Sequence, residues 1–227
     1  MISAVNAIAR KLVPSVHPYD TGNVYRMRRF QLLKEIIDDI LASRPSCRII
    51  DVGGLSAYWR TFGSELDWTR VKVVVVNLTK EAADSREIVT AQGDARDLHE
   101  FADMSFDLVY SNSVIEHVGL WRDMQRMAGE VRRLAPRYFV QTPYFWFPIK
   151  PHARTPLLHW LPEPLKTRIV MWRSCGFWAK AANIGEATEL VQSAFMLDKR
   201  QLQQLFPDAR IVAETAFGLT KSIMAIK

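Results

Sequence analysis

The sequence predicts a doubly wound α/β fold, in which helices cover both faces of a mostly parallel sheet. Helical and strand-like hydrophobic periods alternate from residue 24 onward, and the predicted strands end in small or polar residues. The chain of 227 residues is 48% hydrophobic and 24% charged, an ordinary globular composition that is long enough to bury a full core. These observations argue against a disordered, fibrous or metal-stapled protein.

Each expected element follows from its local pattern. Helical spacing of apolar residues predicts helices at 24–42, 57–66, 124–134 and 199–206. Short β-branched runs predict seven strands, at 48–52, 71–78, 87–91, 106–110, 137–141, 209–217 and 222–226. The last two strands are joined through Gly218, and so short a link makes them antiparallel. The predicted architecture is a Rossmann-like, seven-stranded sheet with an antiparallel last strand. The carboxyl ends of its parallel strands should meet at one ligand-binding edge.

Residues 142–197 break this alternation. The part from 142 to 180 holds six of the eleven prolines and four of the seven tryptophans, which indicates an aromatic, proline-rich insertion with short helices. Because it leaves the fifth strand at the ligand-binding edge, we expect it to form a substrate lid. We expect residues 1–44 to form an N-terminal helical cap and 45–227 the main domain. The apolar stripe in residues 1–13 fits a helix over the cleft or a weak contact with a membrane surface.

Composition limits the location and the partners. Cys47 and Cys175 cannot form a disulfide framework, and no apolar run approaches the ~20 residues needed to cross a membrane. The N-terminus lacks a signal-peptide pattern, so a cytoplasmic location is expected. A net charge of +6 and a pI of about 9.4 raise nucleic acid or an anionic membrane as partners. The excess lies in residues 1–50 (+4) and 142–180 (+5), which leaves −3 for the rest, and a solvated basic surface explains it equally well.

Polar or small residues stand at the ends of four successive predicted strands. They are Asp51, Gly53 and Gly54 after the first strand, Asn77 after the second, Asp94 and Ala95 after the third, and Asn112 after the fourth. Two glycines after a buried strand let backbone amides approach a ligand closely. Asn77 occupies the place of a ribose-binding side chain in such a sheet, and the Asp94 carboxylate suits an exocyclic amine. The four strand ends therefore predict a single ligand-binding cleft.

Over residues 45–141 the sequence resembles the class I S-adenosylmethionine-dependent methyltransferases, in the branch built on the generic small-molecule methyltransferase domain. The segment 51–54 (Asp-Val-Gly-Gly) resembles the family's first motif, whose loop cradles the methionine moiety of the cofactor. The segment 93–95 (Gly-Asp-Ala) is similar to its adenine-contacting motif, and 106–117 to its fourth-strand motif with a Glu-His pair. One departure is Asn77, where the family usually has an acidic residue. Asparagine can still bind a ribose hydroxyl, but without charge assistance.

The resemblance implies S-adenosyl-L-methionine as the cofactor, S-adenosyl-L-homocysteine as its product, and methyl transfer to an acceptor. A hydroxyl acceptor needs a base, and histidine has the side-chain pKa nearest neutrality. The candidate bases are His117, just beyond the fourth strand, and His152 in the insertion; each could instead have a structural role. The candidate substrate-binding residues are Tyr144, Trp146, His152, Arg154 and His159. The alternative for these is a lid core with a solvated basic surface.

The expected function is O-methylation of a small-molecule or sugar-type acceptor. No metal is expected, because Ser111, Asn112 and Ser113 occupy the place where a metal-assisted enzyme would have acidic ligands. Nucleic acid is not the expected partner, because the motif that base-amine methyltransferases share after this strand is absent. Two alternative functions remain. The high pI is compatible with an RNA-directed methyltransferase or an RNA-binding module, and Asn77 is compatible with an inactive cofactor-binding protein. The oligomeric state is open.

Overall fold

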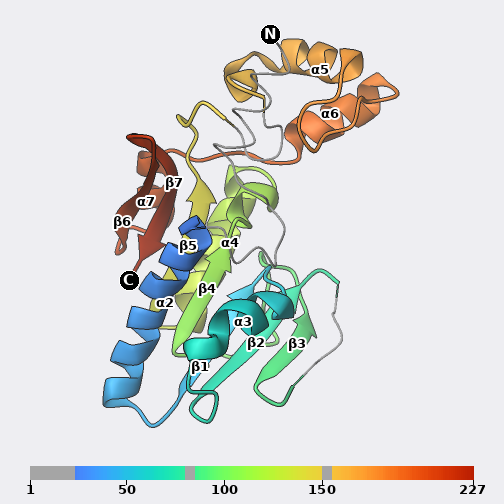
Figure 1. Ribbon diagram of the computed structural model, residues 1–227. Helices are drawn as coiled ribbons and strands as arrows, with labels where there is room; N and C mark the ends of the chain where they lie inside the picture. The colour runs from blue at the N-terminus through green and yellow to red at the C-terminus, as the bar shows by residue number, and fades with distance from the viewer. Residues whose placement is uncertain (1–23, 80–84, 150–154) are drawn as a thin grey trace.

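The computed structural model describes residues 24–79, 85–149 and 155–227. Within them a seven-stranded sheet has the order β3-β2-β1-β4-β5-β7-β6 (Figure 1). Its strands are β1 (Cys47–Val52), β2 (Val71–Asn77), β3 (Ile88–Gln92), β4 (Leu108–Asn112), β5 (Arg137–Pro143), β6 (Arg210–Ala216) and β7 (Leu219–Ile226). Neighbouring strands are parallel except that β7 runs antiparallel to both β5 and β6. The predicted fold class is confirmed, and the chain reverses its direction of winding between β1 and β4, where such sheets bind ligands.

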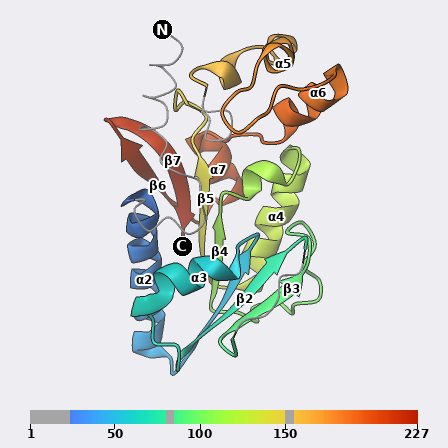
Figure 2. The ribbon, with the colours of Figure 1, turned by 45° about the vertical axis from the view of Figure 1, so that its right-hand side comes forward.

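Helices cover both faces of the sheet (Figure 2). On one face α2 (Val24–Ser43) and α3 (Ser56–Phe62) share a buried cluster with β1 and β2. On the other face, α4 (Trp121–Leu134) and α7 (Lys199–Leu205) form a second buried cluster with the strand side chains that point to that face. The central strands are apolar almost throughout because both of their faces are buried.

Helix α2 belongs to this main core. Its buried apolar residues Phe30, Leu33, Ile37 and Ile40 recur at three- and four-residue intervals, so they form one stripe along the helix. They pack in the same cluster as Ile49 of β1. The rest of the predicted N-terminal cap, including the apolar stripe of residues 1–13, lies outside the described residues.

Two strands, β4 and β5, end two residues later than the sequence predicts. Strand β4 covers 108–112, so Ser111 and Asn112 are part of the sheet and pair with Val140 and Gln141 of β5. Strand β5 continues to Pro143, which pairs with Ser222 of β7. Proline cannot donate a backbone hydrogen bond, but it is tolerated at a strand end, where the pairing stops. The insertion therefore leaves the sheet at residue 144.

The insertion folds around a small core of its own. It contains the short helix η3 (Leu158–Trp160), α5 (Glu163–Trp172) and α6 (Ile184–Gln192), with Val170, Trp178 and Val191 among its buried residues. It lies beyond the carboxyl end of β5, away from the body of the sheet (Figure 1). In the described parts of the chain we find no helix with the length and apolarity that crossing a bilayer requires.

Candidate active site

The loop after β1 is closely packed against the loop after β4. Gly53 has a φ of +76°, and its N–H donates to the Val76 carbonyl of β2 at 2.7 Å. A Cβ atom on Gly53 would lie 2.5 Å from the Val114 side chain, well inside contact distance. Both the positive φ and the close approach therefore require glycine here, and together they set the position of the loop at the switch point of the sheet.

Gly54 makes room for a buried carboxylate. Asp51, the penultimate residue of β1, is 1% exposed, and its Oδ2 accepts a hydrogen bond from Trp59 Nε1 of α3 at 2.7 Å. A Cβ atom on Gly54 would lie 1.9 Å from the same oxygen. The Asp51–Trp59 contact thus ties α3 to the end of β1 beside the glycine loop, which gives Asp51 a structural role.

Asn77 braces the glycine loop from the end of β2. Its Nδ2 donates to the Gly54 carbonyl at 3.1 Å, and its Oδ1 accepts from the Leu78 backbone N–H at 2.8 Å. The amide supplies both the donor and the acceptor that this position uses, whereas an ionised carboxylate cannot donate. This contact is a local reason for asparagine at the position where the family usually has an acid.

The Asp94 carboxylate is held by Arg96, two residues away. The Arg96 side chain donates to both carboxylate oxygens at 2.6–3.0 Å, and these hydrogen bonds keep the pKa of Asp94 below its ordinary value. Arg96 also donates to the Val118 carbonyl at 3.3 Å. The segment after β3 is therefore connected to the segment after β4. Ala95 is half-buried against the core.

At the end of β4, the structure places a buried arginine that the sequence analysis did not single out. Arg29 of α2 is 8% exposed, and its guanidinium donates to Asn112 Oδ1 at 2.6 Å and to Gln141 Oε1 at 2.9 Å. Its Nε lies 3.1 Å from Glu214 Oε1 of β6. One guanidinium thus joins α2 to three strands, and it fixes the orientation of the Asn112 amide at the carboxyl end of β4.

Glu214 also faces a second cation. Lys221 of β7 lies 3.8 Å from Glu214 Oε2, and its ammonium is 3.5 Å from the centre of the Tyr25 ring. Burial lowers the pKa of Lys221 to about 8, although Glu214 opposes this shift. Ser222 Oγ donates to the same Glu214 oxygen at 2.8 Å. A buried charged cluster therefore lies where the last two strands meet α2.

The loop after β4 is joined directly to the returning segment of the insertion. His117, in the short helix η2 (Ile115–His117), is exposed, and its Nδ1 lies 2.8 Å from the Ser193 carbonyl. The Phe195 N–H donates to the Glu116 carbonyl at 2.7 Å. Glu116 is fully buried, and its Oε2 accepts from Thr142 Oγ1 of β5 at 3.0 Å. These contacts hold segment 193–196 against the end of β4.

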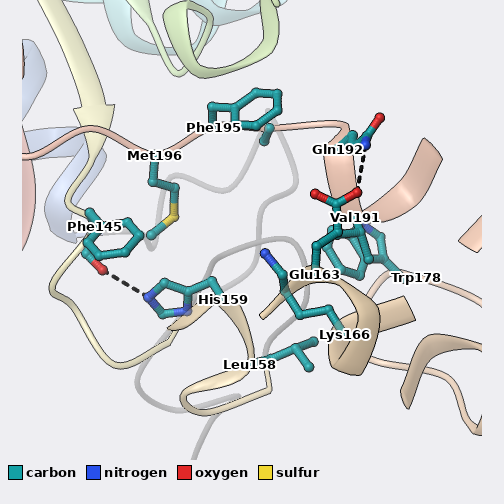
Figure 3. Close-up of a pocket in the computed structure, with 11 residues that line it drawn as sticks. Phe145, Leu158, His159, Glu163, Lys166, Trp178, Val191, Gln192, Phe195 and Met196 are labelled. Atoms are coloured by element: carbon teal, nitrogen blue, oxygen red, sulfur yellow. Dashed lines mark hydrogen bonds between the residues drawn. The ribbon is translucent and has the colours of Figure 1, made fainter. Parts of the chain in front are cut away.

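Segment 194–196 forms one wall of a pocket of about 120 Å³ inside the insertion (Figure 3). Its polar lining comprises His159, Glu163, Lys166 and Gln192, and its apolar lining comprises Phe145, Leu158, Trp178, Val191, Ala194, Phe195 and Met196. His159 Nε2 donates to the Phe145 carbonyl at 2.9 Å, and Glu163 accepts from Gln192 at 2.7 Å. Figure 3 shows the Lys166 ammonium extending between His159 and Glu163.

Of the three predicted substrate-binding residues that the structure describes, His159 lines the pocket and the other two do not. Tyr144 lies at the start of the insertion, where its N–H donates to the Lys221 carbonyl at 3.1 Å. Trp146 is 58% exposed and contacts Phe145 edge to face. His152 and Arg154 lie outside the described residues. Among the residues described, no group of three or more His, Cys, Asp or Glu side chains could hold a metal ion.

Comparison with known proteins points to one class of domain. Residues 52–137 match the family described as "Methyltransferase domain". These residues run from the end of β1 to the start of β5, so they include the glycine loop, Asn77, Asp94 and His117. No curated protein sequence matches the chain.

Solved structures share the fold at low sequence identity. A S-adenosylmethionine-dependent methyltransferase from Aquifex aeolicus aligns with a TM-score of 0.50 and 10% identity over 97% of this chain and 96% of that one. The CurJ carbon methyltransferase aligns with a TM-score of 0.54 and 11% identity over 87% of this chain, which spans only 53% of that structure. An N-methyltransferase of Haemonchus contortus, crystallised with phosphomonomethylethanolamine and S-adenosylhomocysteine, aligns with a TM-score of 0.50 and 17% identity, over 82% of this chain and 39% of that one.

Proposed function

We propose that the chain is a class I S-adenosylmethionine-dependent methyltransferase that methylates a hydroxyl group of a small, ring-sized acceptor bound in the pocket of the insertion. The observation that carries the proposal is the junction between the loop after β4 and the wall of the pocket. His117 contacts Ser193, and Phe195, which lines the pocket, contacts Glu116. Residues 193–195 thus connect the proposed acceptor pocket with the loop after β4, at the edge of the sheet where the cofactor is proposed to bind.

The residues at the strand ends fit the cofactor. Gly53 and Gly54 let the loop after β1 pack closely at the carboxyl edge of the sheet, Asn77 braces this loop, and Asp94 adds a carboxylate at the neighbouring strand end. We propose that Gly53, Gly54, Asn77 and Asp94 hold the cofactor. Asn112 would then lie between the cofactor site and the acceptor site. When bound, S-adenosylmethionine supplies a methyl group on a sulfonium sulfur and leaves as a neutral thioether. The protein then has to align the acceptor and exclude water.

The pocket suits a small polar ring. Its volume of about 120 Å³ approaches the ~150 Å³ of an apolar cavity that accepts benzene. Aromatic side chains such as Phe145 and Phe195 can lie against a ring, while His159, Glu163 and Lys166 offer hydrogen-bonding groups for its substituents. We propose that residues 144–197 act as the substrate lid and that these groups set the acceptor specificity.

We assign the base to His117. Because its Nδ1 faces the Ser193 carbonyl, the neutral ring carries its proton on Nδ1 and its lone pair on Nε2. With a hydroxyl acceptor and the cofactor bound, His117 Nε2 would take the hydroxyl proton as the methyl group is transferred to the oxygen. The Ser193 carbonyl holds the ring in the required tautomer and also stabilises the imidazolium that forms.

The test has two separate arms. Binding is measured by thermal shift, and S-adenosylhomocysteine should raise the melting temperature while NAD does not. Turnover is measured with methyl-labelled cofactor against a panel of small hydroxylated acceptors. His117→Gln should lower turnover by roughly 10²–10⁴-fold, with partial recovery at high pH, and should leave S-adenosylhomocysteine affinity within about threefold. His159→Gln should raise KM more than it lowers kcat.

Two results would overturn the proposal. Stabilisation by NAD equal to that by S-adenosylhomocysteine would contradict the cofactor assignment. Cofactor binding without turnover on any hydroxyl acceptor, together with labelling of RNA, would favour an RNA-directed enzyme, whose binding should depend steeply on salt.

A further inference from the structure

Three large apolar side chains project from one end of the α5–α6 pair. Trp172 ends α5, Phe177 lies in the connection and Ile184 begins α6, and they are 73%, 55% and 68% exposed. The Ala181 N–H donates to the Val170 carbonyl at 3.1 Å, so the end of the connection returns to the end of α5. The three side chains therefore lie at the same end of the pair, which we call the α5–α6 tip (residues 170–184).

The exposure of Phe177 follows from a built turn. Cys175 and Trp178 exchange two backbone hydrogen bonds, of 2.9 and 3.0 Å, around Gly176, whose φ is +62°. Cys175 and Trp178 are buried in the insertion core, at 1% and 8% exposure. Because Cys175 and Trp178 are buried in the insertion core, the turn between them leaves the Phe177 side chain on the surface. The outward position of Phe177 is therefore set by the fold of the turn, and contiguous exposed apolar side chains on a folded surface are a mark of an interaction site.

Every charged side chain within residues 164–185 is a cation, and the nearest acid to Ile184 is the exposed Glu186 in the first turn of α6. Residues 164–185 contain four cations, Lys166, Arg168, Arg173 and Lys180, and no Asp or Glu. Arg168 and Lys180 are exposed. The flanking carboxylates are engaged within the insertion: Glu163 accepts from Gln192, and Glu186 accepts from the Ala182 N–H. The next acid, Glu189, is exposed five residues beyond Ile184 along α6.

We propose that the α5–α6 tip docks on an anionic membrane surface. Tryptophan, phenylalanine and isoleucine side chains enter the boundary between headgroups and acyl chains, and Trp is the residue that favours this boundary most. Arg168 and Lys180 contact anionic headgroups, where each cation contributes about 1 kcal/mol, or about fivefold in binding. The absence of carboxylates from residues 164–185 is what such a surface requires. The inference does not depend on methyl transfer.

The test uses the whole chain and co-sedimentation with vesicles. Vesicles of phosphatidylcholine containing about 30% phosphatidylglycerol should bind the protein at least about tenfold more strongly than phosphatidylcholine alone at ~0.1 M salt. The triple variant Trp172→Ser/Phe177→Ser/Ile184→Ser should lose at least about tenfold of this binding. The matched control is Phe217→Ser, because Phe217 is also 73% exposed but lies at the turn between β6 and β7. It should bind like the parent chain.

A second pair of variants separates charge from apolar contact. Arg168→Gln/Lys180→Gln should reduce binding to anionic vesicles by roughly tenfold or more, whereas Arg122→Gln/Arg200→Gln, an exposed pair on α4 and α7, should change it by less than about threefold. A thermal melt of each variant shows that it is folded. Brominated lipid should quench tryptophan fluorescence in the parent chain and quench it less in Trp172→Phe.

Three outcomes overturn the proposal. The first is no preference for anionic vesicles. The second is full binding by the folded triple variant, especially if removal of residues 1–23 abolishes it, because that segment would then be the membrane contact. The third is a change in solution mass from a dimer in the parent chain to a monomer in the triple variant, which would make the tip an interface between two copies.

Discussion

Replacing Arg29 by methionine tests the buried charged cluster at the edge of the cleft. Arg29 and Glu214 have side chains that are 9% and 7% exposed, and their closest charged atoms lie 3.1 Å apart. Methionine keeps much of the side-chain length on α2 but removes the charge and every donor. Asn112 Oδ1 and Gln141 Oε1 then each lose the hydrogen bond that they accept from Arg29.

The size of the effect follows from what is left behind. Removing one partner of a buried ion pair costs roughly 3–5 kcal/mol, because the other charge stays buried. Glu214 keeps Lys221 at 3.8 Å and the Ser222 hydroxyl at 2.8 Å, and Gln141 still accepts from Ser113, so we expect the lower end, about 3 kcal/mol. With a urea slope of about 2 kcal/mol/M, the unfolding midpoint should fall by about 1.5 M.

The assay is urea unfolding of the single and double variants at neutral pH. Glu214→Gln alone should also destabilise the protein, because it leaves Arg29 and Lys221 close together without a carboxylate. The double variant Arg29→Met/Glu214→Gln should be more stable than the sum of the single effects predicts, by about 0.5–3 kcal/mol. The matched control is Arg28→Met, the same substitution at the adjacent, exposed position of α2, with an expected change within about 0.5 kcal/mol.

The reasoning fails if Arg29→Met lowers the free energy of unfolding by no more than Arg28→Met does. That result would mean that the guanidinium is not desolvated at this position. Strict additivity of the Arg29 and Glu214 substitutions would mean that the two charges do not interact.

Three further predictions follow from the described contacts. Burial lowers the pKa of Lys221 to about 8, so above that pH the unfolded chain binds more protons than the folded one. Between pH 8 and 10.5, the free energy of unfolding of the parent chain relative to Lys221→Met should therefore rise by up to about 3 kcal/mol, measured by urea unfolding. Asn77→Asp should weaken S-adenosylhomocysteine binding about tenfold by calorimetry, because it loses the donor to the Gly54 carbonyl; unchanged affinity would show that this contact does not hold the loop. Burial raises the pKa of Cys47 to about 12, so its thiol should react with a thiol reagent only after unfolding, and rapid reaction of the native protein would contradict the burial.

The sheet could be predicted because its signals are local. A buried parallel strand such as β2 is apolar on both faces, and α2 repeats its apolar residues at helical spacing. The strand ends were also predictable, since a glycine or an amide directly after an apolar run marks the point where the chain leaves the sheet. The ends of β4 and β5 were harder to predict. Pairing with β5 extends β4, and pairing with β7 extends β5, over residues of low strand propensity that include Pro143.

The roles of the predicted residues depend on contacts between distant segments. From the sequence alone, aspartate would be expected to serve as well as Asn77; the hydrogen bond to Gly54 reverses that expectation, and it joins residues 23 positions apart. The pocket could not be predicted either, because its lining comes from four places in the sequence that meet only when the insertion folds: residues 145, 158–166, 178 and 191–196. His159 was found because histidine is rare and conspicuous, whereas Glu163 and Lys166 look like ordinary residues of a surface helix.

Arg29 is the clearest case of a signal that the sequence does not carry. It lies in a run of three arginines, Arg26, Arg28 and Arg29, and a basic run at the start of an amphipathic helix normally indicates a solvated face. Its partners Asn112, Gln141 and Glu214 lie 83, 112 and 185 positions away, so no periodicity could connect them. A buried charge is tolerated only where several acceptors converge on it. Here they converge because β4, β5 and β6 bring their side chains to one place beside α2, so the arrangement of the strands assembles the cluster.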